Sequence, residues 1–272
     1  MLTIASLSIR EAASRRVALI VAVLTLLGIL ASVWAFAGLS GGLQPREAVP
    51  GFQAGFTIFL AFAFSAGTGV AAAFLAAPAV AADLSSGIAL AVLPRPLSRS
   101  DYVAGKWLGL GGLAVGYVAV SVGIEFLALR VAAGYAAPHP AVATLCLATE
   151  TLVVATLALA FGTRLPAVGA GILAVALFGL AWLDGFVASI AQAVHNDALL
   201  AAARAIALAL PSDLLWRGAV FALEPDAMVG PGAPPNPFLV QTSLGWPEAA
   251  WVAGWFVAVL ALTMRGFAAR DV

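Results

Sequence analysis

Charged residues, cysteine and histidine are all scarce in this sequence. Only 10% of its 272 residues are charged, and it contains one cysteine, Cys146, and two histidines, His139 and His195. One cysteine excludes an intramolecular disulfide framework, and three such side chains are too few for a cysteine- or histidine-rich metal centre. So small a charged fraction cannot form the hydrated surface that a soluble domain of this length needs. We therefore expect no metal ligands and no soluble globular fold.

Apolar residues dominate instead. Hydrophobic residues make up 63% of the chain, and the mean hydropathy is +1.06, which is typical of an integral membrane protein. Thirteen Lys and Arg residues are balanced by thirteen Asp and Glu residues, so no net positive charge draws the chain to nucleic acid. We expect membrane lipid as its surroundings and no nucleic-acid partner.

Six stretches between charged residues are long enough to cross a bilayer. A spanning helix needs about 20 predominantly apolar residues, and each stretch reaches or approaches that length. The sequence therefore predicts an all-α integral membrane protein with six transmembrane helices in a single domain. The expected spans are 17–39, 52–81, 107–129, 141–162, 166–190 and 247–264.

The placement of Lys and Arg predicts the orientation of these spans. Basic residues favour the cytoplasmic segments of membrane proteins. With both termini inside, nine of the thirteen fall on the cytoplasmic side and four on the outer side. We therefore expect a multi-pass protein of the cell inner (plasma) membrane with both termini in the cytoplasm. The inner set is Arg10, Arg15, Arg16, Arg95, Arg99, Lys106, Arg164, Arg265 and Arg270; the outer set is Arg46, Arg130, Arg204 and Arg217.

The first residues admit more than one interpretation. In 1–16, Leu2, Ala5, Ile9 and Ala12 with Ala13 recur at helical spacing, which favours an interfacial helix on the inner leaflet over an unstructured basic leader. A cleaved signal peptide over 1–37 is a further alternative. Its apolar run, however, exceeds the roughly 7–15 residues usual in such signals.

The longest segment outside the spans is 191–246, on the expected extracytoplasmic side. Its Ala- and Leu-rich part, 197–210, contains Arg204 and is short for a span, so we predict an interfacial or re-entrant helix. A seventh span there would also move the C-terminal arginines to the outer side. Ser212 and Asp213 are expected to cap a second short helix through Phe221.

Signatures of catalysis are absent from the sequence. It contains no P-loop, no dinucleotide-binding G-x-G-x-x-G after a strand, no H-E-x-x-H and no G-x-S-x-G. We therefore expect no catalytic residues, no cofactor bound by this chain and no enzymatic activity of its own. ATP hydrolysis would require another subunit.

The expected cytoplasmic loop 82–106 is unusually structured for a connection between spans. Pro94 and Pro96 must end any helix that precedes them, and Ser98 with Asp101 has the spacing of a capping box. A short helix tied to two spans and flanked by basic residues is a docking surface for a soluble partner. An ordinary basic inside loop is the alternative.

Eight residues in and beside this loop stand at a characteristic spacing: Asp83, Gly87, Pro96, Ser98, Arg99, Tyr102, Gly105 and Lys106. With them the loop resembles the signature region of ATP-binding-cassette (ABC) transporter permeases of the type-2 exporter class. Asp83 stands where Glu is commoner and Ile88 where Thr is commoner. The resemblance implies an exporter that forms a homodimer and binds two copies of a separate cytoplasmic ATPase, which would hold ATP and Mg. It also implies an ATPase-coupling segment formed by Asp83, Gly87, Arg95, Pro96, Ser98, Arg99 and Lys106.

A fainter similarity concerns Pro211, Asp213 and Arg217. Their spacing resembles an element in the outer segment of permeases of nitrous-oxide-reductase maturation systems. A helix cap followed by an outer arginine is the alternative.

Two further patterns fall within the spans. Glycines on one face of the third span let helices approach closely in lipid, within the subunit or across a dimer; they are Gly105, Gly109, Gly112, Gly116 and Gly123. Glu125, Glu150 and Asp184 lie within spans, where an acid is costly unless it faces a cavity or a partner. They predict either a polar transport path or structural pairing.

Together these features favour a permease subunit driven by a separate ATPase. An ion-coupled secondary carrier that uses Glu125 and Glu150 is one alternative. A non-transporting membrane scaffold for an extracytoplasmic partner is the other. The sequence does not identify the substrate.

Overall fold

The computed structural model describes residues 2–14, 16–42, 49–85, 98–225, 240 and 243–269, and every regular element in this part of the chain is an α-helix. Six helices are long and apolar enough to cross a membrane, with α3 and α4 counted together. The predicted all-helical class and the six apolar spans are therefore confirmed, and they indicate a multi-pass membrane protein. The six are α2 (Arg16–Gly42), α3 (Val49–Ala76) continued by α4 (Pro78–Ser85), α6 (Arg99–Ala133), α7 (Pro140–Gly162), α8 (Ala167–Ala193) and α12 (Trp246–Ala268).

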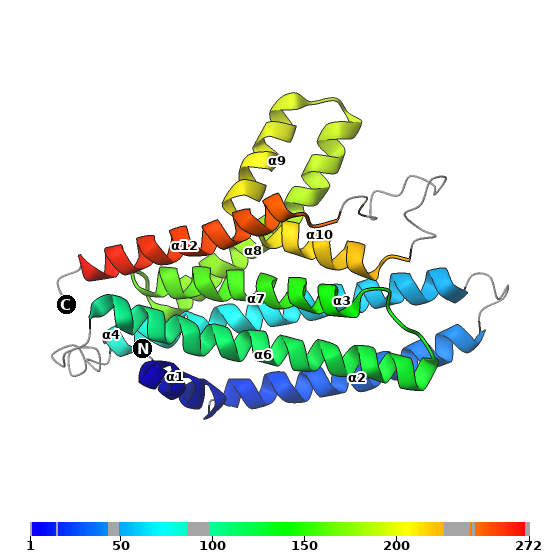
Figure 1. The fold of residues 1–272 in the computed structure, drawn as a ribbon, viewed down its shortest axis with the longest axis horizontal. Helices are drawn as coiled ribbons and strands as arrows, with labels where there is room; N and C mark the ends of the chain where they lie inside the picture. The colour runs from blue at the N-terminus through cyan, green and yellow to red at the C-terminus, as the bar shows by residue number, and fades with distance from the viewer. Residues whose placement is uncertain are drawn as a thin grey trace.

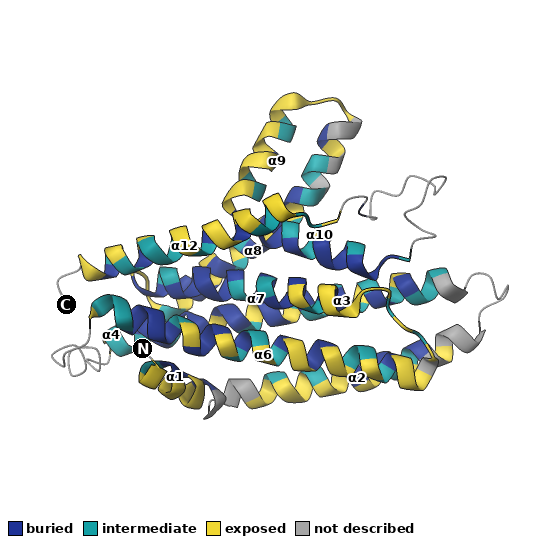
Figure 2. Cartoon of the chain, in the orientation of Figure 1, coloured by how far each residue is buried: buried dark blue, intermediate teal, exposed yellow. Residues whose placement is uncertain are grey.

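Most of these helices run roughly parallel, with α7 at the centre of the bundle (Figures 1 and 2). Buried side chains line α7 along most of its length. Many of them are alanines and other small residues, which let the neighbouring helices approach closely. At the end of α7, a Cβ placed on Gly162 would lie only 2.4 Å from the carbonyl oxygen of Ala77.

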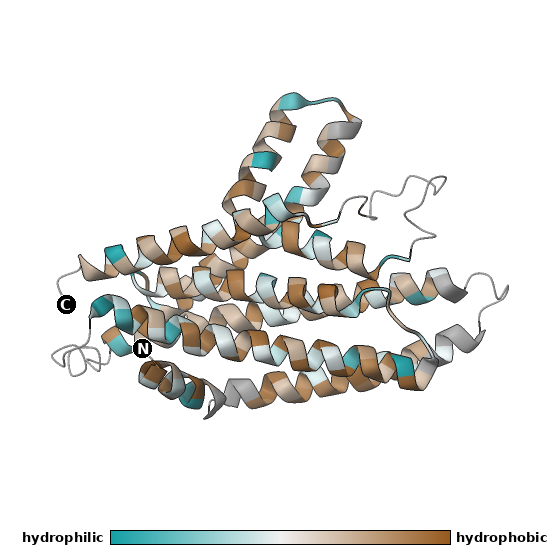
Figure 3. Cartoon of the chain, in the orientation of Figure 1, coloured by the Kyte–Doolittle hydropathy of each residue, from teal (hydrophilic) through white to brown (hydrophobic). Residues whose placement is uncertain are grey.

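In contrast to α7, α2 lies at the edge of the bundle. Most of its side chains are apolar, its visible face is mainly hydrophobic in Figure 3, and Leu24, Leu27 and Leu30 are each more than half exposed. Water would oppose so large an apolar surface, whereas lipid accepts it. The outward surface of α2 therefore fits a lipid environment.

The N-terminal helix, α1 (Leu2–Ser14), packs against α6. Its buried face consists of Ala5, Ser8 and Ala12, whereas Leu2 is 83% exposed. The predicted helix is present, and of its predicted apolar stripe Ala5 and Ala12 face the bundle whereas Leu2 faces outward. A Cβ on Gly109 would lie 2.5 Å from the carbonyl oxygen of Ala5, and only small side chains fit so close an approach.

Two short helices, α9 (Asp197–Ala209) and α10 (Ser212–Leu223), follow α8 and meet at an angle of 90°. The end of α8 and α9 project sideways from the bundle (Figure 1). By contrast α10 packs along α7 and is largely buried. The predicted side-chain cap at Ser212 and Asp213 is wrong: Pro211 holds the cap position, and the two polar residues lie buried in the first turn.

Candidate functional site

A cluster of charged side chains lies at the end of the bundle where α1, α4, α6 and α12 meet (Figure 1). Lys106 Nζ lies 2.9 Å from Asp83 Oδ2 and 3.5 Å from Glu11 Oε2. The Tyr102 hydroxyl donates a hydrogen bond to the same Asp83 oxygen. The Tyr102 ring lies 5.8 Å from Lys106 Nζ and stacks on Phe267 of α12. Lys106 of α6 thus contacts α4 and α1, and the Tyr102–Phe267 pair connects α12 to the same cluster.

The charged groups of this cluster are largely buried, so their pairing matters for the stability of the fold. Lys106 is only 7% exposed, and an ammonium group removed from water is costly unless anions compensate it. Asp83, at the end of α4, is also largely buried, while Glu11 is about half exposed. The Lys106–Asp83 contact is therefore the principal pair, and Glu11 adds a more hydrated second anion.

The start of α6 is fixed by two further contacts beside this cluster. Ser98 Oγ accepts a hydrogen bond from the Asp101 backbone N–H at 3.0 Å, as the sequence spacing predicted. This cap explains why α6 begins at Arg99, well before the predicted span at residue 107. Arg99 Nη1 donates to the carbonyl oxygen of Ala268 at 3.2 Å, which ties the start of α6 to the end of α12.

The structure brings together only part of the predicted coupling segment. Asp83 and Lys106 are in direct contact, and Ser98 and Arg99 lie at the adjoining helix start. Gly87, Arg95 and Pro96 lie outside the described residues. Sequence reasoning missed Glu11, because no local pattern reveals that a side chain of the first helix meets the third span.

Two of the predicted intramembrane acids, Glu150 and Asp184, lie on the neighbouring helices α7 and α8. Glu150 on α7 accepts a hydrogen bond from Ser65 Oγ at 2.9 Å, and its other oxygen is buried without a partner among the described atoms. Asp184 on α8 likewise has one buried oxygen with no described partner. Asp213, at the start of α10, lies within electrostatic range of both acids.

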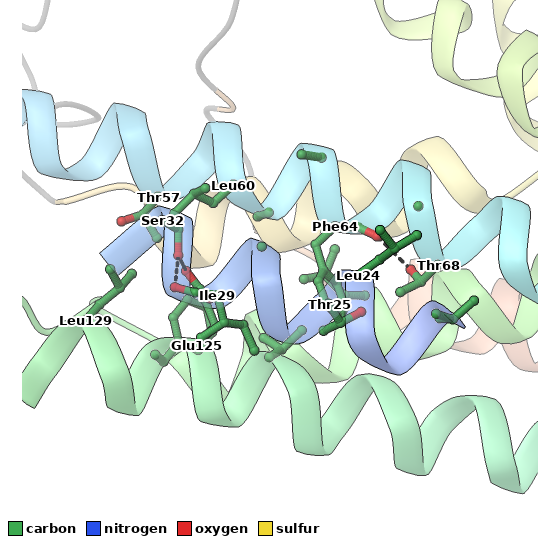
Figure 4. A pocket seen from close by; sticks show the side chains of 18 residues that line it. Leu24, Thr25, Ile29, Ser32, Thr57, Leu60, Phe64, Thr68, Glu125 and Leu129 are labelled. Carbon is green, nitrogen blue, oxygen red and sulfur yellow. Dashed lines mark hydrogen bonds between the residues drawn. The ribbon is translucent and has the colours of Figure 1, made fainter. Parts of the chain in front are cut away.

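The third acid, Glu125, lines a cavity of about 320 Å³ between α2, α3 and α6 (Figure 4). Ser32 Oγ on α2 donates a hydrogen bond to Glu125 Oε1 at 2.5 Å. The remaining lining is mainly apolar, with the hydroxyls of Thr25, Thr57 and Thr68 the other polar side chains. Glu150 and Asp184 do not line this cavity, so the three acids do not share it as one path.

The glycines predicted to form one stripe on α6 lie in two different surroundings. Gly109 allows the close approach of α1, and Gly105 is buried. At Gly112, Gly116 and Gly123 a Cβ would meet no other described atom within 4 Å. Part of the predicted stripe therefore packs within the chain, and part faces outward.

Metal binding has no obvious place in the described residues, where no group of three or more His, Cys, Asp or Glu side chains could hold an ion. Comparison of the chain with protein-family models gives no match. Comparison with curated proteins gives none either.

Proposed function

We propose that this chain is the membrane-spanning permease subunit of an ABC transporter of the type-2 exporter class. In this proposal two copies form a homodimer in the cell inner membrane, with their termini in the cytoplasm. Each copy binds a separate cytoplasmic ATPase through the loop 82–106. The ATPase supplies ATP and Mg chemistry, and the permease itself makes and breaks no covalent bonds.

The observation that carries the proposal is the Lys106–Asp83–Glu11 cluster. The segment 86–97 follows Ser85, the last residue of α4, and precedes Ser98, the cap of α6. Because Lys106 of α6 pairs with Asp83 of α4 at 2.9 Å, the two helices that flank this segment are tied to each other. A displacement of that segment by a bound partner would therefore act on α4 and α6 together.

The contacts around the cluster extend this coupling to two more helices. Glu11 joins α1 to Lys106, and the Arg99 contact joins α6 to the end of α12. Movement driven by ATP binding and hydrolysis could thus change the packing of several spans at once. Such a change would release a substrate taken from the cytoplasm or the inner leaflet to the outer side.

The decisive experiment is purification of the tagged chain from its native membrane. The proposal requires an ATPase with a P-loop to co-purify, and its ATP hydrolysis in the complex to be measurable. Arg95→Ala, in the proposed docking loop, should lower recovery of the ATPase. Arg204→Ala, an exposed residue on α9, is the matched control and should not. Purification without any ATPase, under conditions that keep the chain folded, would refute the proposal.

An ion-coupled carrier is a second candidate, favoured by one observation. The Glu150 carboxylate is buried with an oxygen that lacks a described partner, and buried acids in membrane proteins often mark proton or ion paths. This candidate requires substrate flux in vesicles that contain the chain alone and no ATP. Flux that depends on both ATP and the co-purified ATPase would contradict it.

A further inference from the structure

The cavity between α2, α3 and α6 has an unusual combination of an acid and an otherwise apolar wall. Its volume of about 320 Å³ is at the lower end of the range for small-molecule pockets. Leu24, at its edge, is 62% exposed, and the lining residues Gly28 and Gly67 are exposed as well. The cavity is therefore open to the surface of the chain rather than sealed within it.

Glu125 is the only ionisable group among the described residues that line this cavity. Its hydrogen-bond partner is the Ser32 hydroxyl, at 2.5 Å, and the single hydrogen of that hydroxyl is also within reach of the Ile29 carbonyl oxygen at 2.8 Å. One neutral donor compensates a carboxylate poorly in an apolar environment, where an unpaired charge costs several kcal/mol. The site therefore lacks a positive charge, which an occupant could supply.

The hydroxyl groups of the lining sharpen this requirement. Thr57 Oγ1 donates to the Gln53 carbonyl at 2.8 Å, and Thr68 Oγ1 donates to the Phe64 carbonyl at 2.9 Å. A hydroxyl has one hydrogen to donate and two lone pairs that can accept. With their hydrogens used within α3, these threonines keep only lone pairs, and Thr68 Oγ1 also lies 3.3 Å from Thr151 Oγ1 of α7. Like Glu125, they have acceptors and no free donor.

We propose that this cavity binds a small apolar primary amine, whose ammonium group pairs with Glu125 and whose hydrocarbon part fills the apolar remainder. An ammonium group has three donors and no acceptor, which complements a lining of acceptors. A carboxylate would be repelled by Glu125. A neutral hydrocarbon chain would leave that acid without a cation. Figure 4 shows Glu125 of α6 and Ser32 of α2 in direct contact at one end of the lining, so the pairing position is formed by two helices.

This inference concerns binding by the chain alone and does not rest on the proposed function. The test uses the purified chain in phosphatidylcholine nanodiscs and three diazirine photoprobes of equal length: an octylamine, an octanol and an octanoic acid analogue. Mass spectrometry of the cross-linked peptides locates the label. The amine should label peptides of α2, α3 and α6 at concentrations at which the alcohol and the acid do not.

Two substitutions in the cavity then test the mechanism. Glu125→Gln keeps the size of the side chain and an acceptor for Ser32, but removes the charge. It should weaken amine labelling by about tenfold or more, the effect of losing one charge-assisted contact. Gly28→Leu adds a side chain where a Cβ would meet no described atom within 4 Å, and should block the amine by occupying the space.

The matched control is Glu150→Gln, which changes a second serine-bonded acid outside the cavity. It should leave amine labelling unchanged, and equal melting temperatures of the two Gln variants would show that both are folded. Equal labelling of the wild type and Glu125→Gln by the amine would overturn the proposal. So would equal labelling by amine and alcohol, because that result would mean that the cavity accepts any lipid-like chain.

Discussion

Lys106 Nζ lies 2.9 Å from Asp83 Oδ2, and this ion pair joins α6 to the end of α4 across the segment 86–97. Both side chains are largely buried, so the pair is shielded from the solvent that weakens most surface ion pairs. The pair stabilises the packing of α6 against α4, and in the proposed function it also holds together the two helices that flank the coupling loop.

Replacement of Lys106 by Met should destabilise the chain strongly. The change leaves Asp83 largely buried without its cation, and breaking a buried pair from one side costs about 3–5 kcal/mol. Thermal unfolding of the chain in detergent would measure the loss. The double variant Asp83→Asn/Lys106→Met should lose less than the sum of the two single variants, because it removes both charges. Strict additivity would mean that the two side chains do not interact.

Substitution of Gly109 by Leu should detach α1 from α6. A Cβ at this position would lie 2.5 Å from the Ala5 carbonyl oxygen, so the added side chain cannot be accommodated without movement of the helix. We expect a stability loss of about 1–3 kcal/mol, typical of overpacking, and faster proteolysis near residue 8. Gly112→Leu is the control, since a Cβ there would meet no described atom within 4 Å. Similar effects of the two substitutions would argue against close packing of α1.

The proposed orientation predicts which exposed positions can be labelled from outside the cell. In a Cys146→Ala background, a cysteine at Arg204 should react with a membrane-impermeant maleimide in intact cells. A cysteine at Ser85 should react only after the membrane is permeabilised. Both positions are exposed in the structure, so burial does not account for a difference. The opposite pattern would reverse the topology.

Replacement of Glu224 by Gln should stabilise the chain increasingly as pH rises. Glu224 Oε1 accepts the Val240 backbone N–H at 2.9 Å, whereas Oε2 is buried without a described partner. Burial raises the pKa of this carboxyl group above its ordinary value. The folded state then holds its proton to higher pH than the unfolded state, so stability falls as pH rises between the two pKa values. Gln cannot ionise, and its amide oxygen can still accept the hydrogen bond.

Thermal unfolding of both forms in detergent from pH 4 to pH 8 would test this expectation. The melting temperature of the wild type should decline relative to Glu224→Gln over that range. Glu224→Ala serves as the comparison, because it removes the acceptor as well and should be less stable than Glu224→Gln at every pH. Parallel profiles of the wild type and Glu224→Gln would show that ionisation of Glu224 does not contribute.

Sequence reasoning succeeded where the physical cause is local. The length of an apolar run limits the length of the helix it can form, so each predicted span falls on one of the observed apolar helices. The Ser98 cap was equally readable, since a side chain and a backbone N–H three residues apart decide it. The buried face of α1 was only partly readable, because Gly109 of another helix determines it.

The sequence by itself determined that this is an all-helical chain with six apolar helices fit for a membrane, because backbone hydrogen bonds in lipid must be satisfied within each segment. Only the tertiary structure decided which polar and charged side chains meet. Glu125 and Ser32 are 93 residues apart, and Glu11 reaches Lys106 only because α1 folds back onto α6. Such pairings follow from how helices pack in three dimensions, and the spacing of residues along one helix contains no information about its neighbours.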